Sequence, residues 1–142
     1  MKKLPILAFI FIIACQSGKN RSDSIVDGQI SIDSLKSEVL FLHDEVMPKM
    51  GELRRVRKDL MLQADSLMQS DSTKANIFNS LANEIGNSSE GMMQWMRAFE
   101  PDFEGTEDEV RSYLEAQKES IQIVKTDMEN SLTEGRKAIG QD

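Results

Sequence analysis

The chain has 142 residues, and its 24 acidic against 17 basic side chains give a net charge of −7 at pH 7. An acidic chain argues against nucleic acid or anionic lipid as a general partner, and the length suits one modest core. The chain has one histidine and one cysteine, which exclude an intramolecular disulfide, a zinc site with several histidines and Cys-His catalysis. It also has no GxGxxG or P-loop motif, so we do not expect an enzyme.

The first residues have the pattern of an export signal. Lys2 and Lys3 precede an apolar run over residues 4–13 that is too short to span a bilayer. The sequence Ile-Ile-Ala-Cys that ends at Cys15 resembles the lipobox of bacterial lipoproteins, in which the cysteine is acylated and becomes the first residue of the mature chain. We therefore predict a signal peptide over 1–14, lipidation of Cys15 and anchoring in the bacterial cell envelope, with the outer membrane favoured over the inner. Cleavage would remove two lysines and leave a net charge of −9.

The remaining chain divides into a tether and one helical domain. Residues 15–29 are polar and predict a flexible tether, and residues 30–142 predict the domain. Apolar residues then recur every seven positions, which is typical of a coiled-coil-like seam; they are Val39, Val46, Leu53, Leu60 and Leu67. Pro48 should kink this long helix, and the turn sequence over 69–73 should end it, with Asp71 or Ser72 as the next N-cap.

Two further helices follow. The second carries an apolar face and stops at Pro101; the face consists of Phe78, Leu81, Ile85, Met92, Met96 and Phe99. The third begins at a capping box of Thr106 and Glu109 and ends before Gly140; its apolar residues are Val110, Leu114, Ile121, Val124, Met128 and Leu132. No segment alternates with period two, so the predicted fold is an all-α, up-down-up three-helix bundle with a long kinked first helix.

Two segments concentrate methionine around the single histidine and the single tryptophan. The first holds His43, Met47 and Met50, and the second holds Met92, Met93, Trp95 and Met96. A hairpin that turns at Asp71 places residues equally distant from the turn at the same height. This predicts that Met50 lies level with Met92, and Met47 with Trp95.

Three interpretations of this methionine cluster are open. Thioethers and imidazole favour Cu(I), and a tryptophan face attracts a cation, so the side chains could bind Cu(I) or Ag(I). Their types resemble those of periplasmic copper and silver chaperones, although nothing matches those β-barrel proteins in order. Methionine also fills irregular gaps, which a proline-kinked bundle would have, and we favour this packing role. The third interpretation is a methionine-rich groove for a partner helix.

A basic run stands out in this acidic chain. It consists of Arg54, Arg55, Arg57 and Lys58. The run could be a docking patch for an acidic partner or for lipid headgroups. The simpler interpretation is a solvated helix face with salt bridges from Arg55 to Glu52 and Asp59.

Four Asp-Ser steps resemble the acceptor sequence for O-glycosylation of exported proteins in Bacteroidota. The serines are Ser24, Ser34, Ser66 and Ser72. Asp-Ser is also a sequence that helix caps and turns favour. Both interpretations stay open.

The segments HDEVMPKM (43–50), GMMQWMRAFEPDFEGT (91–106) and SLTEGRKAIG (131–140) together resemble a group of small Bacteroidota lipoproteins. Some of these carry the label "viral A-type inclusion protein". The resemblance covers most of the mature chain and implies an envelope location, but the group has no assigned chemistry. We expect an envelope-anchored module that binds or scaffolds a protein partner without a cofactor; the alternative is a copper-handling lipoprotein.

Overall fold

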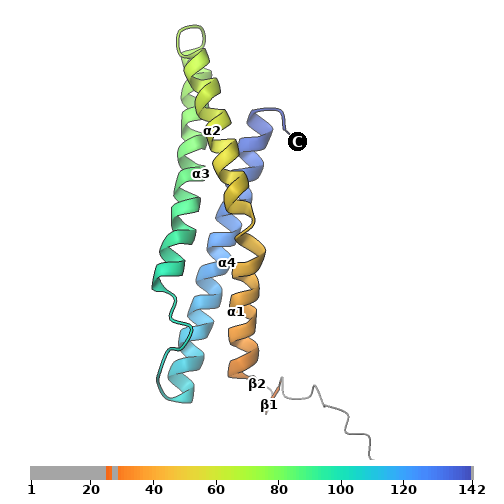
Figure 1. Cartoon of the computed structure of the whole chain (residues 1–142), viewed down its shortest axis with the longest axis vertical. Coiled ribbons are helices and arrows are strands. Elements are labelled where there is room, and N and C mark those ends of the chain that lie inside the picture. Colours follow the sequence, from red (N-terminus) through yellow and green to blue (C-terminus); the bar gives the residue numbers. More distant parts are fainter. Residues whose placement is uncertain (1–24, 27–28, 142) are drawn as a thin grey trace, which may run out of the picture.

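The structure, a computed structural model, describes residues 25–26 and 29–141. Within them lie four helices, α1 (Ile32–Val46), α2 (Lys49–Leu67), α3 (Ser72–Ala98) and α4 (Glu107–Ala138). In this elongated bundle α1 and α2 run one way, α3 returns, and α4 runs in the first direction again (Figure 1). The predicted all-α, up-down-up bundle is confirmed, and α1 and α2 together form its long kinked first helix.

A short strand pair precedes α1. β1 (Ile25–Val26) pairs antiparallel with β2 (Gln29–Ile30). The sequence did not predict these strands, because two residues are too few to produce a period-two pattern. The strand pair therefore spans the boundary between the predicted tether and the predicted domain at residue 30. The predicted signal peptide over 1–14 and Cys15 lie outside the described residues.

Pro48 separates α1 from α2. Proline has no amide hydrogen to donate to the carbonyl of Asp44, so the helix cannot continue unchanged. The amide of Met47 donates to the carbonyl of His43 at 3.0 Å as the C-cap of α1, and α2 begins at Lys49. The chain bends at this break (Figure 1), as the sequence predicts.

α2 and α3 form the predicted antiparallel hairpin. The carboxylate of Asp71 accepts a hydrogen bond from the amide of Lys74 at 3.0 Å and is the N-cap of α3. The turn is centred midway between Leu67 and Ser72, slightly before Asp71. Moving the turn by one residue shifts the pairing of residues across the hairpin by two, so the position of the turn decides which side chains lie level.

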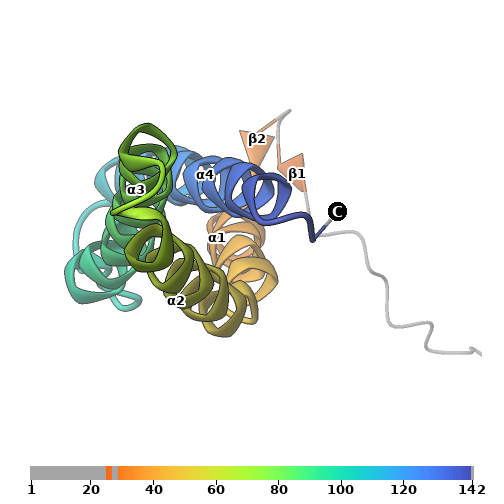
Figure 2. The ribbon, with the colours of Figure 1, turned by 90° about the horizontal axis from the view of Figure 1, so that it is seen from above.

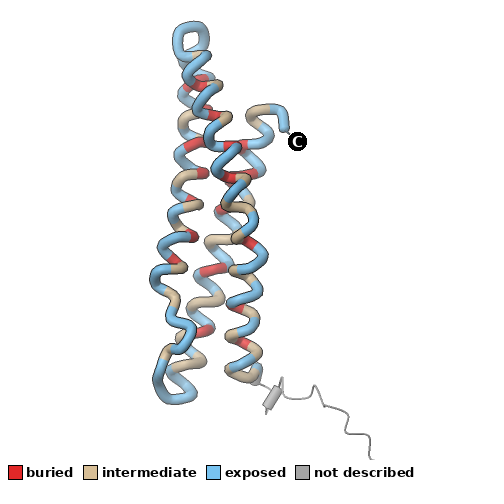
Figure 3. The backbone as a smooth tube through the Cα atoms, in the orientation of Figure 1, coloured by how far each residue is buried: buried red, intermediate tan, exposed pale blue. Residues whose placement is uncertain are grey.

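The core lies between α4 and the other helices, because α4 packs against α1, α2 and α3 (Figure 2). Buried residues follow the inner side of each helix (Figure 3). The largest fully buried side chains are Leu53, Leu60, Ile85, Met92, Ile121, Met128, Val39 and Val46. Of the heptad residues predicted for the seam, only Leu67 is half-buried. It is the last residue of α2, and that end of α2 extends past α4 (Figure 1).

α4 comes closest to the hairpin at Gly135, which is itself buried. A Cβ atom at this position would lie 2.8 Å from Cδ1 of Ile85 and 2.9 Å from Cγ1 of Val56. Both distances are well inside van der Waals contact. The absence of a side chain at Gly135 therefore allows α4 to lie this close to α2 and α3.

The first turn of α4 contains the predicted capping box. The carboxylate of Glu109 accepts hydrogen bonds from the backbone amide and the hydroxyl of Thr106, both at 2.8 Å. These bonds stabilise the charged form and lower the pKa of Glu109. A pKa that is lower in the folded than in the unfolded chain stabilises the fold at neutral pH, and this stabilisation is lost as the pH falls through the folded pKa.

We therefore expect Glu109→Gln to reduce the acid sensitivity of the fold. Glutamine keeps the capping hydrogen bonds but does not titrate. The fall in the free energy of unfolding between neutral pH and about pH 3 should be smaller in this variant than in the wild type, as measured by urea denaturation. Glu134→Gln, at an exposed position late in α4, is the control. An equal change in both variants would contradict the prediction.

Candidate functional site

The two methionine-containing segments meet where α1 faces α3. The imidazole of His43 lies 5.8 Å from the indole of Trp95, between ring centroids, with the planes tilted by 31°. Trp95 is only 5% exposed and stacks on Phe99 at 4.8 Å. The prediction that the two segments approach each other is correct, and the contact joins His43 to Trp95.

The aromatic stack continues into α4, which sequence reasoning missed. Phe99 lies 6.4 Å from Tyr113, and Tyr113 lies 4.3 Å from Phe103 in the loop before α4. The hydroxyl of Tyr113 accepts a hydrogen bond from the amide of Glu100 at 2.6 Å. The stack joins α3, the following loop and α4. A possible signal was the concentration of aromatic residues on both sides of the Pro101 break.

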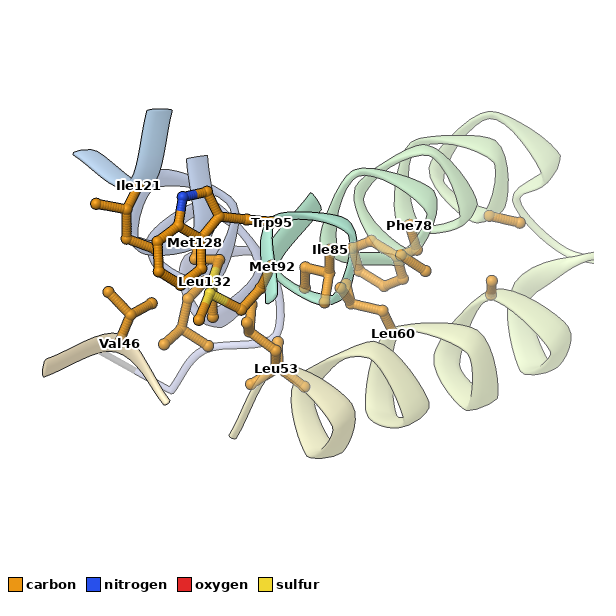
Figure 4. Close-up of a cluster of buried hydrophobic side chains, with 14 of the residues drawn as sticks. Val46, Leu53, Leu60, Phe78, Ile85, Met92, Trp95, Ile121, Met128 and Leu132 are labelled. Atoms are coloured by element: carbon orange, nitrogen blue, oxygen red, sulfur yellow. The ribbon is translucent and has the colours of Figure 1, made fainter. Parts of the chain in front are cut away.

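The methionines of the predicted site have different surroundings. Met92 is fully buried and projects into the core beside Leu53 and Met128 (Figure 4). Met47, Met50 and Met96 are half-buried and pack against the core, whereas Met93 is 38% exposed. Met50 and Met93 line one groove between α2 and α3. The seven predicted residues are thus spread over the core, this groove and the contact between α1 and α3.

The predicted metal site offers one imidazole and several thioethers as ligands. In the described part of the molecule, no group of three or more histidine, cysteine or carboxylate side chains is placed to hold an ion. Nδ1 of His43 lies 2.9 Å from Oδ1 of Asp44, and a carboxylate partner of this kind orients an imidazole whose other nitrogen binds metal. Among the described residues, Nε1 of Trp95 is buried without a hydrogen-bond partner.

The predicted salt bridges of the basic run do not form. Glu52 pairs with Arg136 of α4 instead, and Asp59 accepts a hydrogen bond from the side chain of Gln141 at 3.5 Å. Both carboxylates lie toward α4, and Arg55 is exposed on α2. The run is therefore an exposed helix face, as the simpler interpretation predicts, but without the two predicted salt bridges of Arg55.

The predicted glycosylation serines have different positions. Ser24 lies outside the described residues. Ser34 is half-buried in the first turn of α1, where it accepts a hydrogen bond from the hydroxyl of Ser31 at 3.0 Å. Ser66 and Ser72 are exposed on either side of the α2–α3 turn. Glycosylation stays a prediction, which the intact mass of the native protein tests.

No protein-family model, curated protein or solved structure matches the chain. None of the described helices is both long enough and apolar enough to cross a bilayer. The likeness to small Bacteroidota lipoproteins therefore stays a resemblance, and a function must be inferred from the residues and their geometry.

Proposed function

We propose that this protein is a lipid-anchored, non-catalytic binding or scaffolding module of the bacterial envelope. The observation that carries the proposal is the α2–α3 hairpin, which extends past the end of α4 (Figure 1). The hairpin exposes large apolar side chains, namely Met61, Leu62, Met68 and Ile77. Apolar side chains gathered on one exposed element are typical of a protein-binding surface.

The position of the hairpin suits this role. β1 and β2 lie at one end of the bundle and the hairpin turn lies at the other (Figure 1). At about 1.5 Å per residue, α1 and α2 together span roughly 50 Å. Because Cys15 precedes β1, an anchor at Cys15 would attach to the end opposite the hairpin, which would then be free to contact a partner.

The anchor is tested by metabolic labelling with an alkyne-bearing palmitate analogue. We expect the label in the wild type, and we expect its loss together with release from the membrane fraction in Cys15→Ser. Several acyl chains make anchoring stable, so the wild type should need detergent for release. Labelling that persists in Cys15→Ser would contradict lipidation at this residue.

The binding role is tested by photo-crosslinking in cells. Benzoylphenylalanine at Leu62 or at Ile77 should give one discrete adduct with an envelope protein. Phe41 is 63% exposed on α1, and the same probe there is the control, which should give no such adduct. Equal adducts at all three positions, or none at the hairpin, would contradict the proposal.

Soft-metal binding is the second candidate, because His43 packs against Trp95 and has a carboxylate partner. In this case His43, Met47 and neighbouring thioethers would bind Cu(I) or Ag(I). Trp95 is the only tryptophan, so its emission reports binding directly. In a Cys15→Ser protein, Ag(I) should quench this emission, and His43→Ala combined with Met47→Leu should abolish the quenching. Unchanged emission during the titration would exclude the site.

A further inference from the structure

The basic run is the largest set of uncompensated cations in the described part of the chain. Elsewhere in that part, seven lysines and arginines form ion pairs within 4.0 Å, namely Lys36, Lys49, Arg97, Arg111, Lys118, Lys125 and Arg136. No ion pair among the described residues includes Arg54, Arg55, Arg57 or Lys58, and all four side chains are exposed. An acidic protein therefore keeps four neighbouring cations without carboxylate partners.

Three of these cations, Arg54, Arg57 and Lys58, border two adjoining grooves along α2. One groove, of about 220 Å³, lies between α2 and α3 and is lined by Met50, Met93, Arg54 and Arg57. The other, of about 360 Å³, is lined by Arg54, Arg57, Lys58, Met61 and Leu62. Arg54 and Arg57 line both, so the two grooves adjoin along α2 as one apolar and cationic surface. We call it the α2 groove.

Arg57 is held inside the α2 groove. Its Nε donates a hydrogen bond to the carbonyl of Ala82 at 3.2 Å. A Cβ atom at Gly86 would lie only 3.3 Å from that Nε, so the lack of a side chain at Gly86 leaves room for the guanidinium beside α3. One hydrogen bond orients the group, and its remaining N–H groups are available to a carboxylate, which arginine can bind in bidentate geometry.

We propose that the α2 groove binds an acidic amphipathic helix of a protein partner. The inference rests on the proposed binding function and adds the chemistry of the partner. The groove runs from Met50 to Asp65 along α2, about 22 Å at 1.5 Å per residue, or roughly four helical turns. The apolar side chains of such a helix would contact Met50, Met61 and Met93, and its carboxylates would pair with the cations.

The geometry favours a helix over a flat anionic membrane. The hydrogen bond to the carbonyl of Ala82 holds the side chain of Arg57 beside α3, which suits a partner that lies along the groove between the two helices. Asp65 and Glu90 also line the two grooves, and a uniformly negative surface would repel them, whereas a helix can place its carboxylates elsewhere. The unpaired methionine side chains suit a protein groove, since they adapt to the shape of a partner.

The inference is tested with a fluorescent amphipathic helical peptide of about 18 residues built from leucine and glutamate, and with its glutamine counterpart. Using the full chain with Cys15→Ser, we expect the glutamate peptide to bind at least about tenfold more tightly than the glutamine peptide. Arg54→Gln combined with Lys58→Gln should weaken binding of the glutamate peptide by about tenfold or more. Lys74→Gln combined with Lys137→Gln removes the same charge elsewhere and should leave the affinity within about twofold.

Two glycine variants test the placement of Arg57 without a change of charge. Gly86→Ala should displace the guanidinium and weaken binding of the glutamate peptide. Gly91→Ala should not, because a Cβ there meets nothing within 4 Å. Circular dichroism confirms that each variant is folded before its affinity is compared.

Several outcomes would overturn the inference. They are equal losses in the two double variants, equal binding of both peptides, no binding of either, self-association through the groove, or binding to phosphatidylglycerol vesicles without binding to the peptide. The proposed function fails separately, if the hairpin gives no envelope adduct in cells. If an adduct forms and survives Arg54→Gln with Lys58→Gln, the binding function stands and the acidic-helix inference is wrong.

Discussion

Replacing Trp95 with alanine is expected to lower the free energy of unfolding by about 3–5 kcal/mol, the usual cost of truncating a buried tryptophan. The indole is 5% exposed and packs against His43 of α1 and against Phe99, the C-cap of α3. Its removal opens a cavity at the level where these helices face each other. Urea denaturation followed by circular dichroism measures the effect, since the variant has no tryptophan fluorescence.

Trp95→Phe tests the contribution of the indole N–H group to stability separately from that of the aromatic ring. The buried Nε1 has no hydrogen-bond partner among the described residues, and leaving such a group unpaired costs about 1–3 kcal/mol. Phenylalanine removes that group and keeps a ring for stacking, so the gain offsets part of the lost volume. We expect a net loss of no more than about 1.5 kcal/mol. A loss as large as that of Trp95→Ala would show that the N–H group has a partner.

Gly135→Ala is expected to destabilise the fold by about 1–3 kcal/mol, as overpacking of a core does. Alanine in a helix interior would by itself be favoured over glycine by about 1 kcal/mol. The cost of the steric contact is expected to exceed this gain in helix propensity, because the new methyl group would lie 2.8 Å from the side chain of Ile85 and 2.9 Å from that of Val56. To accept it, α4 must move away from the hairpin, which weakens packing along the core.

Gly91→Ala is the matched control within α3. A Cβ atom there meets nothing within 4 Å, so only the propensity term applies, and the variant should gain about 0.5–1 kcal/mol. Thermal and urea unfolding of both variants give the comparison. Equal stabilisation by the two substitutions would contradict the close approach of α4 at Gly135.

The three interpretations of the methionine cluster apply to different residues, according to where each residue lies in the structure. Met92 has the environment of a packing residue, since it is fully buried in the hydrophobic core. Met50 and Met93 line the α2 groove and belong to the partner-binding hypothesis. The soft-metal hypothesis depends on the contact between His43 and Trp95. The Ag(I) titration and the peptide titration therefore test different parts of the molecule.

The sequence by itself determined the local and periodic features of this protein. Val39, Val46, Leu53 and Leu60 follow the seven-residue repeat and are all fully buried, because a repeat near the helical period places its members on one face. The break at Pro48 and the caps at Asp71 and Thr106 were also predictable, since each depends on the backbone chemistry of a few neighbouring residues.

Only the tertiary structure decided which residues meet across the bundle. Whether His43 lies at the same height as Trp95 depends on where the chain turns. An error of one residue in the position of the turn shifts the pairing of residues across the hairpin by two residues. The pairing of Glu52 with Arg136 and the approach of Ile85 to Gly135 join residues far apart in the sequence. Such contacts depend on how closely and at what height three helices pack, which short-range patterns do not encode.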